Sequence, residues 1–289
     1  MVRQDSLNFD PKNEKGPNML TKTATAERIT DRSVEDHEVW NILSCRNFEL
    51  TQHVPFDRRF MPSIKHLGMV ECGVPSFEKV NRMIFQTTGW RLYHPAADTT
   101  NKDVFSLFAK KKFPVLSTIR PRSQIDRAEA PDLFHDYWGH LWMFLDSLLA
   151  SMYEEFGHQS VRVIDSPNNF WLITHLYTNT LEFGLQSARG RVEGFGAALA
   201  SSAEELPYAL QSPLPRRVRL DPTCEADVVR AMRTRYHFSE LQETYFVVTD
   251  WQAFHTLLRS DLTPHYEKAA SLPRLNPGEP CESDVLVPL

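Results

Sequence analysis

Residues 130–140 of this chain read Ala-Pro-Asp-Leu-Phe-His-Asp-Tyr-Trp-Gly-His, and residues 181–185 read Leu-Glu-Phe-Gly-Leu. Together they supply His135, His140 and Glu182, the ligand set of a facial triad for Fe(II). Burying a glutamate on an apolar helix is costly unless the charge has a partner, and a bound cation would neutralise it. We therefore interpret these residues as metal ligands. The alternative is that the histidines are hydrogen-bonded within a helical core.

The spacing of the histidines excludes one familiar metal site. In a zinc protease helix, H-E-x-x-H places the two histidines four residues apart on one face. Here they are five residues apart, at 135 and 140, which is about 140° around an ideal helix. Both can bind one metal only if the helix ends or bulges near Gly139, where glycine permits a distorted backbone. We therefore expect a local irregularity and not a zincin.

Apolar periodicity and capping residues predict a mainly α fold with a small β component. We expect helices over residues 76–88, 103–108, 132–149, 170–185, 224–233 and 250–258, and a short helix opened by a capping box at 202–205. Strands are expected over 115–119 and 244–249. The chain divides into a flexible N-terminal tail (1–33), one catalytic iron-binding domain (34–270) and a Pro-rich C-terminal extension (271–289), which we expect to be loosely attached.

Composition excludes several classes of protein. The chain has 289 residues, of which 42% are hydrophobic, enough for a large core. A net charge of -5 gives no general electrostatic reason to bind nucleic acid. The four cysteines form no CxxC pair, so neither a zinc ribbon nor a disulfide framework is indicated. No apolar run approaches the ~18 residues of a membrane span. We expect a soluble, cytoplasmic protein with no membrane or nucleic-acid partner.

The region from Phe113 to Leu185 resembles the catalytic domain of the pterin-dependent aromatic amino acid hydroxylases, which comprise the phenylalanine, tyrosine and tryptophan hydroxylases. The motifs occur in order: Phe113-Pro114-Val115, Ile119-Arg120, Pro131-Asp132, His-Asp-x-x-Gly-His at 135–140, and Leu-Glu-Phe-Gly-Leu at 181–185. Weaker similarity runs from about Trp40 to Val248. The resemblance implies the compact bacterial form, which uses Fe(II), a tetrahydropterin, O₂ and an aromatic amino acid. Without C-terminal heptads, we expect a monomer or a small homo-oligomer.

The resemblance also implies roles for individual residues. His135, His140 and Glu182 would bind the iron, and Arg120 would bind the amino acid's α-carboxylate through a bidentate contact. An internal salt bridge is the alternative for Arg120. The other residues on the substrate side are Pro131, Thr178, Phe183, Ala198, Ser201 and Ser202. Those on the cofactor side are Phe105, Asp136 and Tyr177.

For several of these residues a purely structural interpretation stays open. Asp136 can be a solvated helix carboxylate, Tyr177 and Phe183 can be core aromatics, and Ser202 can be a helix cap. In the family, the paired serines orient a histidine ligand and the substrate. His175, upstream of Glu182, is expected to be a core residue or to support the metal ligands from outside.

Departures from the family pattern cluster around the substrate and the pterin. Thr178 stands where a large aromatic usually lines the amino acid pocket, which predicts a larger or more polar cavity. Ala198 replaces a glycine, Trp142 stands in Gly-His-Leu-Trp where the family has Gly-His-Val-Pro, and residues 128–130 read Ala-Glu-Ala in place of Thr-Pro-Glu. The pterin loop reads Ala-Ala-Asp-Thr-Thr at 96–100, which leaves Phe105 to stack on a pterin ring.

Three functions are consistent with these observations. The first is a non-haem Fe(II), tetrahydropterin-dependent monooxygenase that hydroxylates the ring of free phenylalanine, tryptophan or tyrosine. The second uses the same iron site for a different oxidation or substrate in a specialised biosynthetic pathway, which Thr178 and the altered pterin loop favour. The third is a helical binding protein without turnover, against which the intact triad argues.

Overall fold

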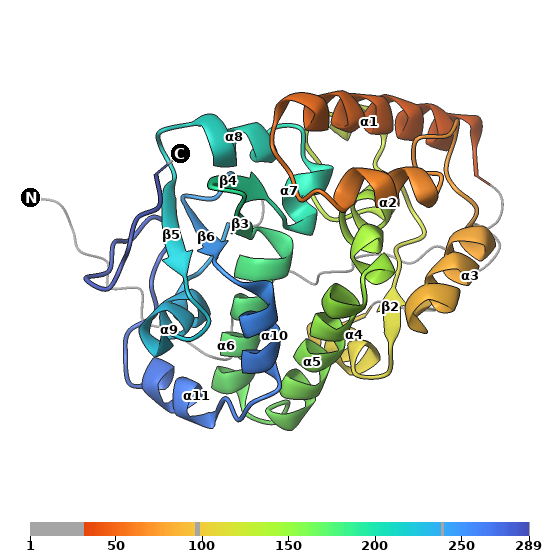
Figure 1. The fold of residues 1–289 in the computed structure, drawn as a ribbon. Coiled ribbons are helices and arrows are strands. Elements are labelled where there is room, and N and C mark those ends of the chain that lie inside the picture. Colours follow the sequence, from red (N-terminus) through yellow and green to blue (C-terminus); the bar gives the residue numbers. More distant parts are fainter. Residues whose placement is uncertain (1–31, 96–98, 238–239, 289) are drawn as a thin grey trace, which may run out of the picture.

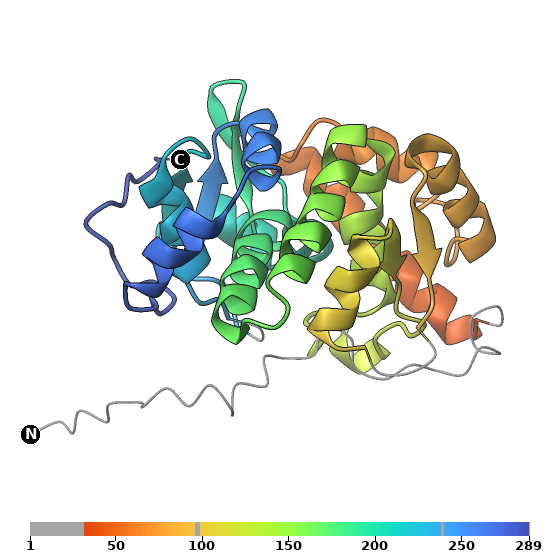
Figure 2. The same cartoon turned by 90° about the horizontal axis from the view of Figure 1, so that it is seen from below.

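The computed structural model describes residues 32–95, 99–237 and 240–288. Within them the fold is mainly α with a small β component, which confirms the predicted fold class. The helices are α1 (Val34–His53), α2 (Phe60–His66), α3 (Phe77–Thr88), α4 (Asn101–Phe108), α5 (Ser147–Arg162), α6 (Pro167–Tyr177), α7 (Ala197–Ser201), α8 (Glu205–Gln211), α9 (Glu225–Arg233), α10 (Trp251–Leu258) and α11 (Thr263–Ala270). α1, α2 and α3 lie towards one end of the molecule and α9 and α11 towards the other, with α5, α6 and α10 between them (Figures 1 and 2).

In the part of the chain that the structure describes, two small sheets accompany the helices. β1 (Arg91–Tyr93) and β2 (Lys112–Pro114) form a parallel pair. β3 (Leu185–Ala188), β4 (Arg191–Gly194), β5 (Arg216–Leu220) and β6 (Thr244–Val248) form a sheet in the order β4-β3-β6-β5, in which only β3 and β4 are antiparallel. β3 follows the segment that carries Glu182 directly, so the sheet fixes the position at which that segment ends.

The described residues contain four irregular helical turns. η2 (Arg122–Gln124) and η4 (Leu141–Leu145) are 3₁₀ turns, whereas η3 (His135–His140) and η5 (Thr178–Glu182) are π-helical turns. The predicted helix over 132–149 is therefore divided into η3, η4 and the start of α5, and the predicted helix over 170–185 ends in η5. Four of the six tryptophans, Trp40, Trp90, Trp138 and Trp142, are fully buried around these turns.

Local sequence signals account for several elements. Ser76 caps α3 by accepting the Lys79 N–H, and Gly89 ends that helix with a φ of 78°, a conformation that favours glycine. β6 and α10 also lie close to their predicted positions. α4 begins earlier than predicted, because Thr100 is its cap and Asp103 completes the capping box from inside the helix.

The predicted strand over 115–119 is wrong, since β2 ends at Pro114. Beyond it, the Leu116 N–H donates to the Asp136 carboxylate at 2.6 Å, and the Thr118 carbonyl accepts from Leu133 N at 2.8 Å. The backbone of this apolar stretch is thus satisfied by the chain around η3 and not by a neighbouring strand.

The C-terminal segment is held more firmly than the sequence indicates. Backbone hydrogen bonds join Val285 and Val287 to β5 at 2.8 Å each. Asp284 accepts from Arg230 at 2.7 Å and from Arg216 at 3.0 Å, and its side chain is 2% exposed. Charged hydrogen bonds of this kind therefore fasten the segment to the domain. Of the predicted N-terminal tail, only Arg32 and Ser33 fall within the described residues.

In the described ranges, none of the helices is both long enough and apolar enough to cross a membrane. The cytoplasmic location expected from the sequence stays a prediction.

Candidate metal centre

Both segments that carry the predicted metal ligands adopt π-helical turns. His135 begins η3 and His140 ends it, while Glu182 ends η5. A π-helix bonds each residue to the one five positions away, so a five-residue spacing brings the two imidazoles to the same side. The irregularity predicted near Gly139 is therefore confirmed. Glycine is required there by packing, because a Cβ atom would lie 2.5 Å from the Ala197 carbonyl oxygen of α7.

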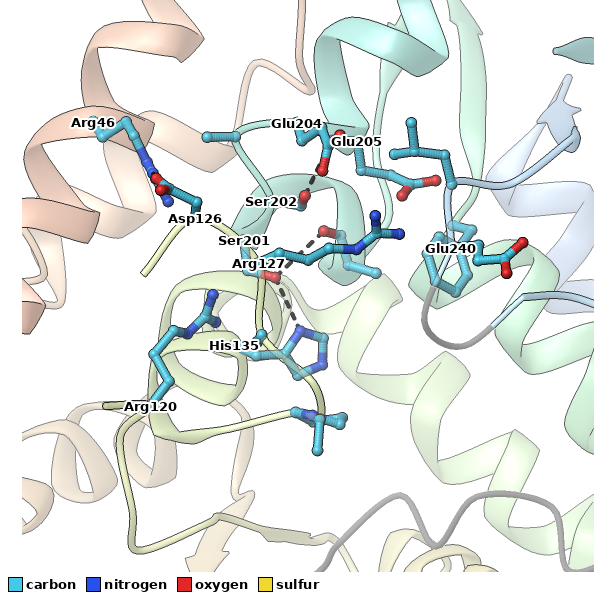
Figure 3. A pocket seen from close by; sticks show the side chains of 17 residues that line it. Arg46, Arg120, Asp126, Arg127, His135, Ser201, Ser202, Glu204, Glu205 and Glu240 are labelled. Atoms are coloured by element: carbon cyan, nitrogen blue, oxygen red, sulfur yellow. Dashed lines mark hydrogen bonds and ion pairs between the residues drawn. The ribbon is translucent and has the colours of Figure 1, made fainter. Parts of the chain in front are cut away.

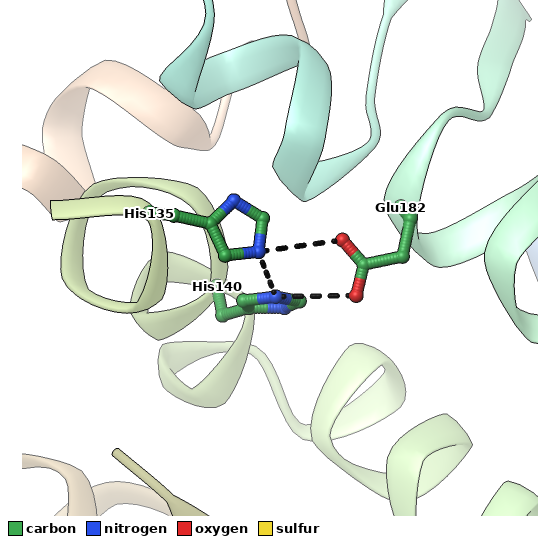
Figure 4. Close-up of side chains that lie close together, drawn as sticks. All are labelled: His135, His140 and Glu182. Carbon is green, nitrogen blue, oxygen red and sulfur yellow. Dashed lines mark hydrogen bonds and ion pairs between the residues drawn. The ribbon is translucent and has the colours of Figure 1, made fainter. Parts of the chain in front are cut away.

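The three side chains converge, as Figure 4 shows. The Nε2 atoms of His135 and His140 are 3.0 Å apart. Glu182 places Oε2 3.6 Å from His135 Nε2 and Oε1 3.3 Å from His140 Nε2. One ligand atom from each residue lies within 4.8 Å of the others. His140 and Glu182 are buried and His135 is half-buried.

The donor set fits a divalent cation. Ser201 Oγ donates to the Ala197 carbonyl at 3.0 Å, so its oxygen accepts from His135 Nδ1 at 2.9 Å. His140 Nδ1 lies 2.7 Å from the Tyr153 hydroxyl. In the tautomers that carry their protons on Nδ1, both Nε2 lone pairs face the centre, where they repel each other unless a cation lies between them. Such partners fix the tautomer and orientation of ligating histidines.

The ionisation of the centre is also appropriate for a metal. Burial and the neighbouring His140 lower the pKa of His135 to about 4. Burial alone would raise the pKa of Glu182, but His140, His135 and the hydrogen bond from Tyr177 outweigh it and bring the pKa to about 2. A neutral imidazole and an ionised carboxylate are the forms that bind metals. Next to them, burial raises the pKa of Asp136 well above its ordinary value.

Two hollows meet at His135 and Pro131, which line both of them. The larger, a cavity of about 130 Å³, opens between η3, α7 and α8 (Figure 3). Its walls include the predicted substrate-side residues Arg120, Pro131, Phe183, Ala198, Ser201 and Ser202. The smaller, of about 20 Å³, is lined by Asp136 and Tyr177, as predicted for the cofactor side, together with Val104, Phe108, Phe113, Pro114 and His140.

Arg120 is engaged within the protein. Its Nε and Nη2 atoms each donate to an oxygen of Asp132 at 2.8 Å, and both side chains are buried. Asp132 also accepts the backbone N–H of His135 at 3.0 Å, so this ion pair supports the start of η3. The internal salt bridge considered from the sequence is therefore present. The guanidinium retains Nη1, for which the described residues provide no partner.

Thr178 does not line the larger cavity. Its hydroxyl donates to the Thr174 carbonyl at 3.0 Å and also interacts with Tyr236, whose ring lies 6.4 Å from that of Phe183. The aromatic ring of Tyr236, from a distant part of the chain, packs beside Thr178 instead. The larger or more polar cavity expected from Thr178 stays a prediction.

The prediction that Phe105 stacks on a pterin is also corrected. Its ring is fully buried against Phe108, Phe170 and Tyr177, while Val104 reaches the smaller hollow. Residues 96–98 of the predicted pterin loop lie outside the described residues. His175 is half-buried and touches none of the metal ligands in the described residues; it stacks on Trp171 with ring centroids 3.5 Å apart, and its Nδ1 lies 2.8 Å from the Trp171 carbonyl.

Sequence reasoning missed several residues of the site. Arg127, Glu205 and Glu240 line the larger cavity, and Tyr153 contacts His140. Arg127 lies in a polar loop and resembles a surface charge in the sequence. In the sequence, Glu205 is recognisable only as part of a capping box. In the structure its backbone N–H donates to Ser202 Oγ at 3.0 Å, as a capping residue requires. No sequence signal connects Tyr153 with His140, because the contact depends on the path of the chain through η4.

The chain is similar in sequence and in fold to known enzymes, and it matches one family model. A family model described as biopterin-dependent aromatic amino acid hydroxylase matches residues 31–268. The phenylalanine-4-hydroxylase of Ralstonia nicotianae is 31% identical over 252 residues, which are 87% of this chain and 78% of that protein. The same enzyme from Chromobacterium violaceum is 29% identical, over 88% of this chain and 83% of that one. A crystal structure of phenylalanine hydroxylase from Chromobacterium violaceum bound to cobalt aligns with a TM-score of 0.82 at 28% identity and covers 94% of each chain.

Proposed function

The chain belongs to the biopterin-dependent aromatic amino acid hydroxylase family, and we propose that it hydroxylates the ring of a free aromatic L-amino acid. It is a monooxygenase of the compact bacterial type and uses non-haem Fe(II) and a tetrahydropterin. The observation that supports the proposal is the convergence of His135, His140 and Glu182 where two hollows meet. Phenylalanine, tryptophan and tyrosine are the candidate substrates.

Each hollow has a proposed occupant. The amino acid occupies the larger cavity with its ring against Pro131, Phe183 and Ala198, close to the His135 side of the metal centre. The pterin approaches through the smaller hollow, where Asp136 and Tyr177 supply polar groups. Iron and reduced pterin, when bound, supply the activation of O₂. The protein holds the metal and orients the ring.

The larger cavity is suited to a zwitterionic head group. Arg127 is exposed, has no carboxylate within ion-pair distance in the described chain, and extends into the cavity (Figure 3). Arg120 Nη1 adds a second donor for the α-carboxylate. Opposite them, Glu205 Oε1 accepts from Gln242 N at 2.9 Å and from the Tyr245 hydroxyl, while Oε2 has no partner in the described ranges.

Glu205 is 7% exposed, and burial raises its pKa, although Tyr245, Gln242 and Arg127 oppose the shift. An α-ammonium group beside Oε2 would compensate this buried charge. We therefore assign the carboxylate of the substrate to Arg120 and Arg127 and its ammonium group to Glu205.

The test is anaerobic loading with Fe(II), addition of tetrahydropterin and O₂, and mass spectrometry of a panel of aromatic amino acids. We expect one free amino acid to gain a single oxygen on its ring in proportion to pterin oxidised. Pterin oxidation without hydroxylation of any member would overturn the proposal.

A second candidate function is the oxidation of a larger aromatic substrate. The observation that favours it is the charged mouth of the cavity, where Arg46, Asp126, Glu204 and Glu240 lie. The panel therefore includes ring-substituted amino acids and aromatic dipeptides. Turnover of these compounds in preference to the free amino acids would support the second candidate.

A further inference from the structure

His140 is supported by a hydroxyl group that belongs to neither hollow. The Tyr153 hydroxyl, on α5, lies 2.7 Å from His140 Nδ1 and donates to Met143 Sδ at 3.3 Å. Tyr153 and Met143 are both fully buried. Three consecutive elements, η3, η4 and α5, thus contribute one residue each to a short chain of hydrogen bonds.

The direction of these bonds determines the proton on the imidazole. Met143 Sδ can only accept a hydrogen bond, so its contact with Tyr153 uses the hydroxyl proton and leaves the Tyr153 oxygen to accept from His140. The Nδ1 atom of His140 then carries the proton, and its Nε2 lone pair faces His135 and Glu182. A buried imidazole has two tautomers, and the partner of one nitrogen decides which is present.

The carboxylate ligand has a tyrosine partner of its own. Tyr177 donates to Glu182 Oε1 at 2.8 Å, and its ring packs edge-on against that of Tyr153, with centroids 5.9 Å apart. Two of the three metal-ligand residues therefore each contact a tyrosine hydroxyl, and the two tyrosines pack against each other.

We propose that Tyr153 is a positioning residue of the metal centre, whose hydroxyl, oriented by Met143, holds His140 in the tautomer and orientation that bind the metal. The inference rests on the iron centre of the proposed function. It assigns no contact with substrate or pterin to Tyr153, which lines neither hollow.

Packing alone does not explain the hydroxyl. The Tyr153 ring contacts Trp90, Phe113 and Phe144, with centroids 6.2, 6.1 and 4.7 Å away. A phenylalanine ring would make the same contacts without burying a polar group, which is unfavourable unless it is hydrogen-bonded. Ser201 supports His135 in the same way, so each histidine ligand has one hydroxyl partner on Nδ1.

The test compares Tyr153→Phe with a matched control, Tyr266→Phe. Tyr266 on α11 is likewise buried, but its hydroxyl has no hydrogen-bond partner in the described residues. Co(II) is titrated into the metal-free protein anaerobically and followed by its visible absorption spectrum. Loss of an outer partner of a metal ligand typically costs about 10–100-fold in affinity. We expect Tyr153→Phe to raise the Co(II) dissociation constant by this factor and to shift the absorption bands. Tyr266→Phe should bind as the wild type does.

Met143→Leu provides an independent variant that keeps the Tyr153 hydroxyl and removes only its acceptor. We expect a weaker effect of the same sign, because the hydroxyl loses its orientation. Wild-type Co(II) affinity and spectrum in both Tyr153→Phe and Met143→Leu would overturn the proposal. If Tyr153→Phe does not fold, unchanged binding by Met143→Leu overturns it alone. These readouts need no substrate, so a failure of the proposed hydroxylation would leave their result unaffected.

Discussion

Replacing Arg120 with lysine separates the part this side chain plays in the fold from its part in substrate binding. Arg120 Nε and Nη2 each lie 2.8 Å from Asp132, and the two side chains are only 8% and 6% exposed. Lysine keeps the charge but has a single nitrogen, so the bidentate contact is lost. One hydrogen bond to a charged group contributes about 1.5–3 kcal/mol. We expect the free energy of unfolding of the metal-free protein to fall by that amount.

The same substitution should also weaken binding of the amino acid, because Nη1 disappears with the guanidinium. Here we expect a rise in KM of about ten- to a hundredfold, which corresponds to the same range of free energy. Urea denaturation measures the first effect and substrate saturation the second. Arg122→Lys is the control, since its ion pair with Glu38 is more than half exposed on both sides, and such pairs contribute about 0–1 kcal/mol. An Arg120→Lys protein with unchanged unfolding and unchanged saturation would refute both assignments.

Four further outcomes are expected. Glu182→Gln should prevent stoichiometric Fe(II) binding, because an amide is a poor ligand for a hard cation; full occupancy, measured by metal analysis, would contradict the assignment. Arg127→Met should raise KM without changing the melting temperature, and an unaltered KM would remove Arg127 from the head-group site. Asp284→Asn should lower the melting temperature by several degrees at neutral pH. Arg230 and Arg216 hold the pKa of Asp284 below its ordinary value against the effect of burial, so its stabilisation is complete above about pH 4 and is lost as the pH falls through the lowered pKa. A deficit that persists unchanged in acid would contradict this. Thr178→Trp should destabilise the protein by about 1–3 kcal/mol through overpacking against Tyr236, whereas wild-type stability with an altered substrate ranking would return Thr178 to the pocket.

The metal centre is the part of the protein that the sequence predicts best. The residue types of a facial triad and the five-residue spacing of His135 and His140 are local properties of the chain, and they require a distorted turn whatever surrounds it. The π-helical form of η3 follows directly from that requirement. The capped helices α3 and α10 are likewise determined by nearby residues.

The errors concern side chains whose surroundings come from distant segments. Thr178 does not line the larger cavity, and the ring of Tyr236, from the segment after α9, packs beside it. Phe105 packs in the core against aromatic rings of another helix. The periodicity of the sequence cannot tell whether Phe105 or the neighbouring Val104 faces the cofactor side. The apolar residues after Pro114 form no strand because their backbone partners lie in and just before the turn η3. In each case tertiary contacts outweigh local propensity.

Because both ligand-bearing turns are π-helical, the metal centre depends on the number of residues in each turn. A π turn is a helix that carries one extra residue, so deleting one residue from η3 would restore regular α-helical winding and leave the two histidines four apart. The two histidines would still lie on one face of the helix. The part of the chain after the deletion, which includes His140, would however be turned by about 100° and moved by about 1.5 Å relative to the segment that carries Glu182. No substitution of a ligand would be needed to dismantle the centre. An engineer who grafts this site onto an ideal helical scaffold would have to transfer both extra residues along with the ligands.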